Sequence, residues 1–312
     1  MANILFIGGA GFIGSCIIKN MLQSLRDFNV FVIEPPFASL SRLEGLNVKV
    51  IKGELVNLDT MFLTLEAYKI DTVVHLVSTI IPGSDFENYK REYQNVIFPT
   101  IEIMKFCAER KIKFVYFSSG GTIYGDTTDL RKFKETDPML PISYYGWSKQ
   151  MMENSIHYVH RTAGLEYLIL RPSNPYGYGQ NIYGKQGLVA VAIGKILSGE
   201  PIQIWGDGSN IRDYIYIDDL AKIVVQLLSK GIDNITLNIG SGTGNSITEI
   251  LNELKDIVAE EVKIEFLPSR KVDVSNMILD VSELKKYVEW EETPLHQGIS
   301  HFYQDVKLNL KL

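Results

Sequence analysis

Tyr145 and Lys149 lie four residues apart at the start of an expected helix, Tyr145–Thr162. On a helix this spacing puts both side chains on one face, one turn apart. A lysine ammonium stabilises a phenolate, so we expect Lys149 to lower the pKa of Tyr145. Such a tyrosine can take a proton from a sugar hydroxyl, or return it, during hydride transfer. The alternative is that Tyr145 is an ordinary packing residue, since the pair also occurs by chance.

A second pattern with chemical meaning is the glycine-rich segment 8–14, which reads Gly-Gly-Ala-Gly-Phe-Ile-Gly. It follows an expected strand ending at Ile7 and opens an expected helix, the context in which such a turn binds a dinucleotide. Gly8 permits the tight turn, Gly11 lets the backbone approach a pyrophosphate, and Gly14 lets the helix pack on the sheet. The helix N-terminus then favours phosphate. The alternative is that the glycines serve only the turn, because the spacing is GxxGxxG rather than GxGxxG.

Glu34 ends the second expected strand, 20 residues after Gly14. A carboxylate at this point accepts hydrogen bonds from the hydroxyls of an adenosine ribose and repels a 2′-phosphate. The next residues are Pro35 and Pro36, so no arginine follows at once to bind such a phosphate. The pattern therefore favours NAD over NADP as cofactor, the alternative being a solvated glutamate.

The elements that position these residues alternate between short apolar runs and helical patterns. This alternation predicts repeated βαβ units, and hence an α/β fold of the Rossmann type with a doubly wound parallel sheet. The expected strands are Asn3–Ile7, Val30–Ile33, Val48–Lys52, Thr72–Leu76, Lys113–Phe117 and Tyr167–Arg171. The expected helices are Gly14–Leu25, Leu58–Tyr68, Asn95–Glu109 and Tyr145–Thr162.

After Arg171 the pattern changes to a turn-rich loop, residues 172–180, and then to shorter elements. These are expected at Leu188–Leu197, Ile202–Trp205, Asp213–Tyr216, Asp218–Leu228, Leu237–Gly240, Ile247–Val258 and Val262–Phe266. We expect residues 1–171, with returning segments near 213–240, to form the NAD-binding domain. Residues 172–312 should mainly form a smaller α/β substrate-binding lobe.

Composition narrows the class of protein. The net charge of −6 over 312 residues argues against a general nucleic-acid or membrane binder. We find no signal peptide and no apolar run of about 18 residues, and expect a cytoplasmic protein. Cys16 and Cys107 lie inside apolar helical patterns, which indicates buried thiols rather than a disulfide or a catalytic pair. No metal-ligand cluster is recognisable, so no metal is expected.

In combination, the motifs resemble those of the extended short-chain dehydrogenases/reductases, the NAD-dependent nucleotide-sugar epimerases and dehydratases. The chain is most similar to UDP-galactose (UDP-glucose) 4-epimerase-like members. The resemblance covers nearly the whole chain and is more specific for the superfamily than for the reaction. Besides the glycine turn and Tyr145 with Lys149, it rests on residues 53–55, 75–77, Asn95, 118–125, 171–174, 205–208, 211–214, and Arg270 with Asp273.

The resemblance implies roles for these residues. In the cofactor site, Gly8, Gly11, Phe12, Ile13 and Gly14 would hold the pyrophosphate, Glu34 the adenosine ribose, Glu54 and Leu55 the adenine, and Lys149 the nicotinamide ribose, with Leu76, Asn95, Ser118 and Tyr145 completing it. In the substrate site, Asn174, Arg212 and Arg270 would bind the diphosphate of a sugar nucleotide and Asp273 its ribose, with Leu188, Trp205 and Tyr214 beside them. A guanidinium suits this task because it binds phosphate oxygens through two parallel hydrogen bonds.

One position departs from the family pattern. The family usually has a serine or threonine four residues before Tyr124, where it hydrogen-bonds the reacting oxygen, and this chain has Gly120. We expect Thr122 to substitute, with Ser119 also flanking the gap. The alternatives are a water molecule, or Tyr145 handling the proton alone. Losing one such hydrogen bond would cost about 1–3 kcal/mol of transition-state stabilisation.

The resemblance leaves the reaction open. We favour a UDP-glucose/UDP-galactose-type 4-epimerase, serving polysaccharide biosynthesis, which forms a transient 4-keto sugar. The alternatives are an NAD(P)H-dependent reductase of a dTDP- or other NDP-4-keto-6-deoxyhexose and a non-catalytic nucleotide-sensing protein. A 4,6-dehydratase is disfavoured, because Gly121 and Thr122 stand where dehydratases carry an acidic pair. Met277, near the position that admits N-acetylated sugars, is flexible and decides little.

The resemblance also implies assembly. The helices Asn95–Glu109 and Tyr145–Thr162 correspond to those that join two subunits in relatives, so we expect a homodimer. The apolar residues expected at this interface are Ile97, Ile101, Met104, Met151, Met152 and Val159. The alternative is that they are buried against the protein's own sheet.

Overall fold

The computed structural model describes residues 2–25, 27–268 and 274–310. At its centre lies a parallel seven-stranded sheet with the strand order β11-β7-β5-β4-β1-β2-β3. The strands are β1 (Ala2–Ile7), β2 (Phe28–Glu34), β3 (Lys49–Lys52), β4 (Thr72–His75), β5 (Lys113–Phe117), β7 (Tyr167–Pro172) and β11 (Ile235–Ile239). The predicted α/β fold with a doubly wound parallel sheet is confirmed.

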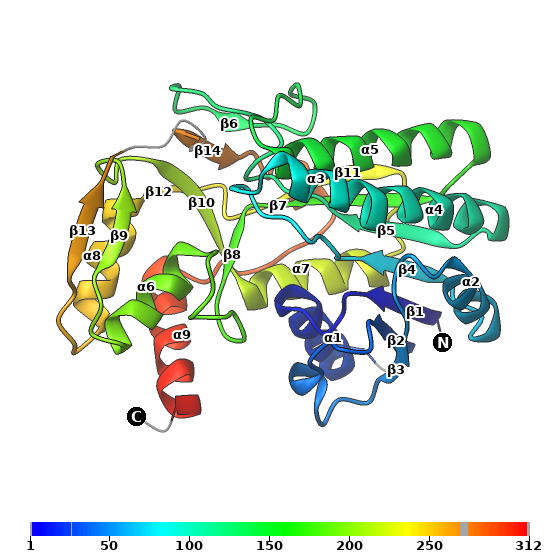
Figure 1. The fold of residues 1–312 in the computed structure, drawn as a ribbon, viewed down its shortest axis with the longest axis horizontal. Coiled ribbons are helices and arrows are strands. Elements are labelled where there is room, and N and C mark those ends of the chain that lie inside the picture. The colour runs from blue at the N-terminus through cyan, green and yellow to red at the C-terminus, as the bar shows by residue number, and fades with distance from the viewer. Residues whose placement is uncertain (1, 26, 269–273, 311–312) are drawn as a thin grey trace.

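Helices cover both faces of this sheet (Figure 1). On one face α1 (Phe12–Ser24) packs against α7 (Ile217–Ser229), and on the other lie α2 (Leu58–Ala67), α4 (Phe98–Arg110) and α5 (Tyr144–Ala163). Successive residues of β1 enter opposite cores: Phe6 packs on the α1 side, whereas Leu5 and Ile7 pack on the α4 side. Burial on both faces explains why the strands are continuously apolar.

The predicted helix Asn95–Glu109 is part of a longer helical segment. It begins with α3 (Phe86–Glu92), capped by the Asp85 carboxylate, which accepts from Asn88 N at 2.8 Å. A π-helical turn, η2 (Tyr93–Ile97), follows and leads into α4. The first turns are polar on most faces and show no apolar period of 3.6, so the sequence did not reveal them.

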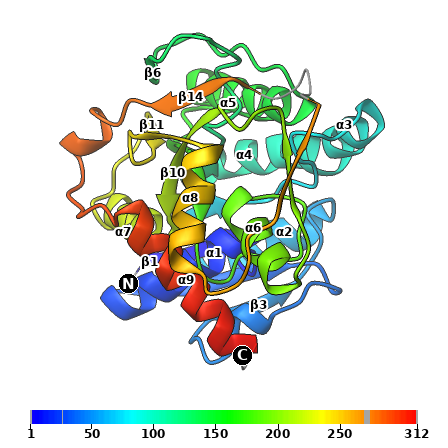
Figure 2. The same cartoon turned by 90° about the vertical axis from the view of Figure 1, so that its left-hand side faces the viewer.

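The second part of the chain forms a smaller α/β region. It contains α6 (Leu188–Leu197), β9 (Ile202–Trp205), β10 (Ile211–Tyr216), α8 (Ile247–Ile257) and β13 (Ile264–Leu267), all near predicted positions. The elements that the sequence did not predict are β6 (Lys132–Phe133), β8 (Asn174–Tyr176), β12 (Gly244–Ser246), β14 (Asn276–Leu279), α9 (Leu295–Leu310) and the 3₁₀ turns η1 (Ser41–Leu43) and η3 (Leu284–Lys286). Figure 2 shows α8 and α9 on the side of the molecule away from the large sheet.

Most of the apolar residues expected at a subunit interface are buried within their own chain. Four of them pack against its large sheet, because they lie on the inner faces of α4, α5 and the preceding π turn: Ile97, Met104, Met152 and Val159. Ile101 and Met151 are partly exposed. The exposed large apolar residues on α4 and α5 are instead Phe98, Trp147 and Tyr158.

Cys16 and Cys107 are buried and unpaired on α1 and α4, which cover opposite faces of the sheet, so the prediction of two separate buried thiols is confirmed. A search of the described residues finds no helix long and apolar enough to cross a membrane.

Candidate active site

Four adjoining hollows lie along the carboxyl ends of the large sheet's strands and continue toward β10. The first contains Glu34, Glu54, Leu55 and Asn95, and it shares Gly8 with the second, which contains Tyr145. The second and third share Asn174, and the third and fourth share Leu188 and Arg212. The hollows thus form one continuous cleft. Loops that follow parallel strands meet at this edge, where α/β proteins bind ligands.

The glycine turn forms the floor between the first two hollows. Gly8 has φ +82°, a conformation that favours glycine, and a Cβ there would lie 2.8 Å from Val77 Cγ2. Gly11 is the N-cap of α1 and offers no side-chain cap. The first N–H groups of this 13-residue helix therefore face the second hollow without a capping side chain, an arrangement that suits a phosphate group.

Glu34 is buried beside this turn, and its Oε1 accepts a hydrogen bond from Ala10 N at 2.6 Å. Burial raises the pKa of Glu34, while the bond from Ala10 and the charge of Lys52 oppose that shift. Among the described residues none donates to Oε2, which leaves this oxygen for the hydroxyls of a ligand. Glu34 therefore both fixes the turn and faces the first hollow.

Three hydroxyl groups form a chain in the second hollow. Thr122 Oγ1 donates to Ser119 Oγ at 3.0 Å, and Ser119 in turn hydrogen-bonds to Tyr145. Lys149, one turn along α5, donates from Nζ to the carbonyl of Phe117 at 3.0 Å and lies 5.4 Å from the centre of the Tyr145 ring. The two predicted catalytic groups and the two predicted supporting hydroxyls are thus brought together.

The expected lowering of the Tyr145 pKa is wrong. Burial raises the pKa of Tyr145 to about 12, and the charge of Glu92 adds to this against the hydrogen bond from Ser119. Burial also lowers the pKa of Lys149 to about 8, although Glu92 and Glu153 oppose that shift. The reason is desolvation, which disfavours the charged form of both groups and is the largest cause of each shift.

The structure also corrects the interpretation of Gly120. A Cβ at this position would lie 2.6 Å from Leu279 Cδ1 and 2.9 Å from the carbonyl of Arg171, so it would point into packed protein. Gly120 does not line the second hollow, whereas Ser119 and Thr122 do. Ser119, rather than the expected Thr122, makes the contact with Tyr145. No hydroxyl is missing from the site, because the supporting pair comes from the neighbouring positions.

The start of α5 is shaped to deliver Tyr145 to this site. Ser143 caps the helix by accepting from Gly146 N at 3.1 Å. A Cβ on Gly146 would lie 2.6 Å from the carbonyl oxygen of Thr122. Glycine at this position therefore lets the helix lie directly against the loop that carries the hydroxyl chain.

Several buried polar atoms in the second hollow lack partners within the described part of the chain. They are Ser118 Oγ, Ser173 Oγ and Gln180 Oε1, and all three residues line the hollow. Buried polar groups are normally hydrogen-bonded, so these atoms indicate that a polar ligand completes the site. The hollow has a volume of about 430 Å³, within the range of small-molecule sites.

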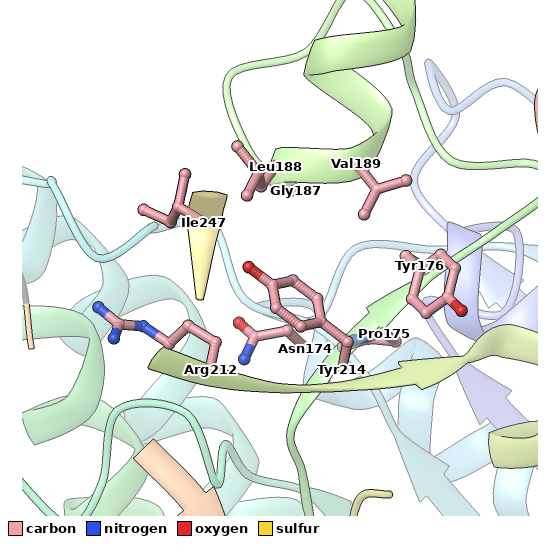
Figure 3. A pocket seen from close by; sticks show the side chains of 9 residues that line it. All are labelled: Asn174, Pro175, Tyr176, Gly187, Leu188, Val189, Arg212, Tyr214 and Ile247. Atoms are coloured by element: carbon pink, nitrogen blue, oxygen red, sulfur yellow. The ribbon is translucent and has the colours of Figure 1, made fainter. Parts of the chain in front are cut away.

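The third hollow lies between β10 and the start of α6 (Figure 3). Asn174, Arg212 and Tyr214 lie on its lower side in the view, facing Gly187 and Leu188. The Arg212 guanidinium donates to the carbonyls of Ile211, Ser275 and Val274. These bonds hold the cation at the junction of the third and fourth hollows, where a phosphate group would find a positive charge.

A buried ion pair supports the catalytic helix from behind. Arg171 Nη2 lies 2.6 Å from Glu153 Oε2, and the side chains are 4% and 0% exposed. Arg171 also donates from Nη1 to the Tyr124 hydroxyl at 2.8 Å. The network fixes α5, which carries Lys149, to β7 and to the loop after β5, which carries Thr122, and Ser173 directly follows β7.

Twenty of the predicted site residues line the cleft, while Arg270 and Asp273 lie outside the described residues. Met277 is fully buried and lines none of the four hollows. Sequence reasoning missed Ser173, Gln180, Gln186, Thr79 and Ile247, which also line the cleft. Ser173 and Gln180 sit in the turn-rich loop after β7, and that position was the available signal.

Comparisons with known proteins agree with this geometry. A model of the NAD dependent epimerase/dehydratase family matches residues 4–240. The putative UDP-glucose 4-epimerase of Methanocaldococcus jannaschii is 30% identical over 98% of this chain and 99% of its own length. The dTDP-4-dehydro-6-deoxyglucose reductase of Escherichia coli is also 30% identical, over 97% of both chains. The crystal structure of UDP-glucose 4-epimerase with UDP-glucose from Thermotoga maritima matches with a TM-score of 0.91 at 29% identity, covering 99% of each chain.

Proposed function

Because the chain belongs to the NAD dependent epimerase/dehydratase family, we propose that it is a UDP-hexose 4-epimerase of the UDP-glucose/UDP-galactose type. The observation that carries this proposal is the hydroxyl chain from Thr122 through Ser119 to Tyr145, above a buried Lys149, in a cleft that continues to Arg212. The similarity to the UDP-glucose 4-epimerase of Thermotoga maritima and to the putative one of Methanocaldococcus jannaschii, over nearly their whole lengths, supports it.

NAD is the cofactor of this family, and the cleft fits it. The uncapped start of α1 would bind the pyrophosphate, Glu34 Oε2 would accept from the adenosine ribose, and Glu54 and Leu55 would flank the adenine. The unpartnered Ser118 hydroxyl lines the second hollow together with Lys149. When bound, NAD supplies the reversible oxidant that an exchange of configuration at a carbon bearing a hydroxyl requires.

The chain's own residues would handle the proton. Tyr145 would accept the proton of the sugar's C4 hydroxyl and later return it, while Ser119 donates to the Tyr145 oxygen and stabilises its negative charge. Lys149 would add a positive charge beneath the tyrosine. Substrate and cofactor would exclude water from this hollow, which strengthens each of these interactions.

The substrate would lie in the second, third and fourth hollows. Arg212 and Asn174 would bind its diphosphate, while Leu188, Trp205 and Tyr214 would surround the remainder of the nucleotide. Apart from Lys149, the side chains that line the hollow around Tyr145 are uncharged, and they include polar ones such as Ser173 and Gln186. Such walls would let a neutral 4-keto sugar turn and present either face to the cofactor.

A reductase of a 4-keto-6-deoxyhexose nucleotide is the second candidate. The similarity to the Escherichia coli reductase favours it, and so does the apolar wall of Ile80, Ile81 and Pro82, which would suit a C6 methyl group. A 4,6-dehydratase remains disfavoured. Among the described residues no aspartate or glutamate lines the second hollow, so the acidic pair for removing water is not found there.

The wider setting is also proposed. Residues 1–171, with returning segments near 213–240, would bind NAD, and residues 172–312 mainly the nucleotide sugar. We expect a cytoplasmic homodimer serving polysaccharide biosynthesis, in which Phe98 and Tyr158 lie at the subunit contact. Phe98→Glu should then shift the mass measured by light scattering from dimer to monomer, and an unchanged dimer would exclude this contact.

The function is tested by denaturing the purified protein, identifying the released nucleotide, and incubating native protein with UDP-glucose. Bound NAD together with formation of UDP-galactose supports the epimerase. A protein that carries no nucleotide and consumes NADPH only with a 4-keto-6-deoxyhexose nucleotide would be the reductase. Tyr145→Phe should suppress either activity, and full retention of activity would refute the assigned site.

A further inference from the structure

Glu92 is a buried carboxylate next to the proposed site and has no part in the chemistry described above. It is 2% exposed and ends α3, immediately before the π turn η2. No ion pair within the described ranges includes it. A carboxylate so deeply buried requires strong hydrogen bonds.

Those bonds come from one loop. Ser78 Oγ donates to Glu92 Oε1 at 2.8 Å, Thr79 N donates to Oε2 at 2.9 Å, and Thr79 Oγ1 also donates to Oε2. All three partners donate to the two carboxylate oxygens, although the two hydroxyl groups could also accept and only Thr79 N is restricted to donating.

The tethered loop is part of the cofactor cleft. Thr79 lines both the first and the second hollow, and Ser78 lines the second with the apolar residues 80–82. On the other side of Glu92, η2 carries Asn95 and Val96 into the first hollow. Glu92 therefore joins two walls of the cleft that are distant in sequence. A π turn inside a helix often accompanies a functional site, and this one directly follows Glu92.

Four titratable groups face Lys149 or Tyr145 from the surrounding elements: Glu92 on α3, Glu153 on α5, His75 on β4 and Tyr116 on β5. Arg171 neutralises Glu153. Burial lowers the pKa of His75 to about 3 and raises that of Tyr116 well above its ordinary value, so both are uncharged near neutral pH. Glu92 is the remaining negative charge of this set, and its charge raises the pKa of both Lys149 and Tyr145.

We propose that Glu92 is a positioning residue with two effects: it ties the loop at Ser78 and Thr79 to the helix before Asn95, and it supplies the negative charge that Lys149 and Tyr145 face. The first effect shapes the walls between which NAD would bind. The second favours the protonated form of Lys149. This inference rests on the proposed function for its cofactor, and its principal test does not depend on which sugar is converted.

The test is calorimetric titration of the full-length protein, cleared of bound nucleotide, with NAD between pH 6 and pH 10. Glu92→Gln removes the charge and forces the Ser78 hydroxyl to accept from the new amide instead of donating, which disturbs the tie to the loop, so we expect NAD binding to weaken by about tenfold or more. The loss of affinity at alkaline pH should also begin at least about half a pH unit lower than in the wild type.

Three further variants separate the effects. Thr79→Val keeps the charge and removes one tethering hydroxyl, so it should weaken NAD binding less than Glu92→Gln and leave the pH dependence unchanged. Glu87→Gln, an exposed position on the same helix, should change neither property. Glu92→Asp should restore the pH dependence without restoring the full affinity.

The proposal is overturned if Glu92→Gln binds NAD within twofold of the Glu87→Gln control, or if its pH dependence equals that of the wild type. A shift of the pH dependence in Thr79→Val would also overturn the assignment of the charge effect. A wild-type protein that binds NAD but converts no UDP-glucose would refute the epimerase while leaving these comparisons intact.

Discussion

Replacement of Glu153 by glutamine tests how the interior supports the catalytic helix. Three hydrogen bonds join Arg171 to the Glu153 carboxylate, with lengths of 3.0, 3.2 and 2.6 Å. Both side chains are almost completely excluded from solvent. Glutamine has the same size but no charge, so the variant leaves the Arg171 guanidinium buried without a counter-ion.

The expected cost follows from that burial. Removing one partner of a buried pair destabilises a protein by about 3–5 kcal/mol, because the remaining charge stays desolvated. Glutamine still offers one oxygen to the guanidinium, so we expect about 3 kcal/mol. The matched control is Glu102→Gln, which removes an exposed pair with Lys105 of similar length, 2.8 Å, and should cost less than about 1 kcal/mol.

The measurement is the free energy of unfolding from urea denaturation of wild type and both variants. The double variant Glu153→Gln with Arg171→Met should lose less stability than Glu153→Gln alone, because it leaves no buried charge unpaired. If Glu153→Gln costs no more than the Glu102→Gln control, or if the double variant is the less stable of the two, the reasoning is refuted.

Three further outcomes are expected. Ser119→Ala should lower the turnover rate by about 5- to 150-fold, the equivalent of about 1–3 kcal/mol, in steady-state assays; a rate within twofold of wild type would exclude its contact with Tyr145. Gly146→Ala should lower both turnover and unfolding free energy, by about 1–3 kcal/mol for the latter, because of the clash with Thr122, whereas Gly83→Ala, which has open space, should change neither. His75 has a folded-state pKa of about 3, so below pH 6.5 the unfolded chain binds a proton that the native protein does not, and His75 should reduce stability by about 1.4 kcal/mol per pH unit toward pH 3. Urea unfolding between pH 6.5 and pH 4.5 should therefore show a smaller slope in His75→Gln, and equal slopes would contradict the assigned protonation.

The sequence predicted the large sheet well because its strands are buried on both faces. Val73 and Phe114, for example, belong to continuous apolar runs that periodicity detects. The strands of the smaller region could not be found in this way, since β6 spans only Lys132–Phe133 and depends on pairing with β14. The family was also predicted from the sequence and is confirmed by the family model.

The sequence predicted which residues form the site better than it predicted their pKa shifts. The spacing of Tyr145 and Lys149 correctly put both side chains in one hollow. It carried no information on desolvation, which reverses the expected pKa shift of Tyr145. The role of Gly120 could not be predicted either. A side chain at this position would meet Leu279, a residue far away in sequence.

The most direct test of the proposed 4-epimerase is to incubate the native protein with UDP-glucose deuterated at C4 and to determine the label in the product by mass spectrometry. The account predicts UDP-galactose that keeps its deuterium, because the C4–H bond is broken and remade inside the closed site without exchange with water. Tyr145→Phe should yield little product. Formation of unlabelled UDP-galactose, or no UDP-galactose at all from protein that holds bound NAD, would contradict the account.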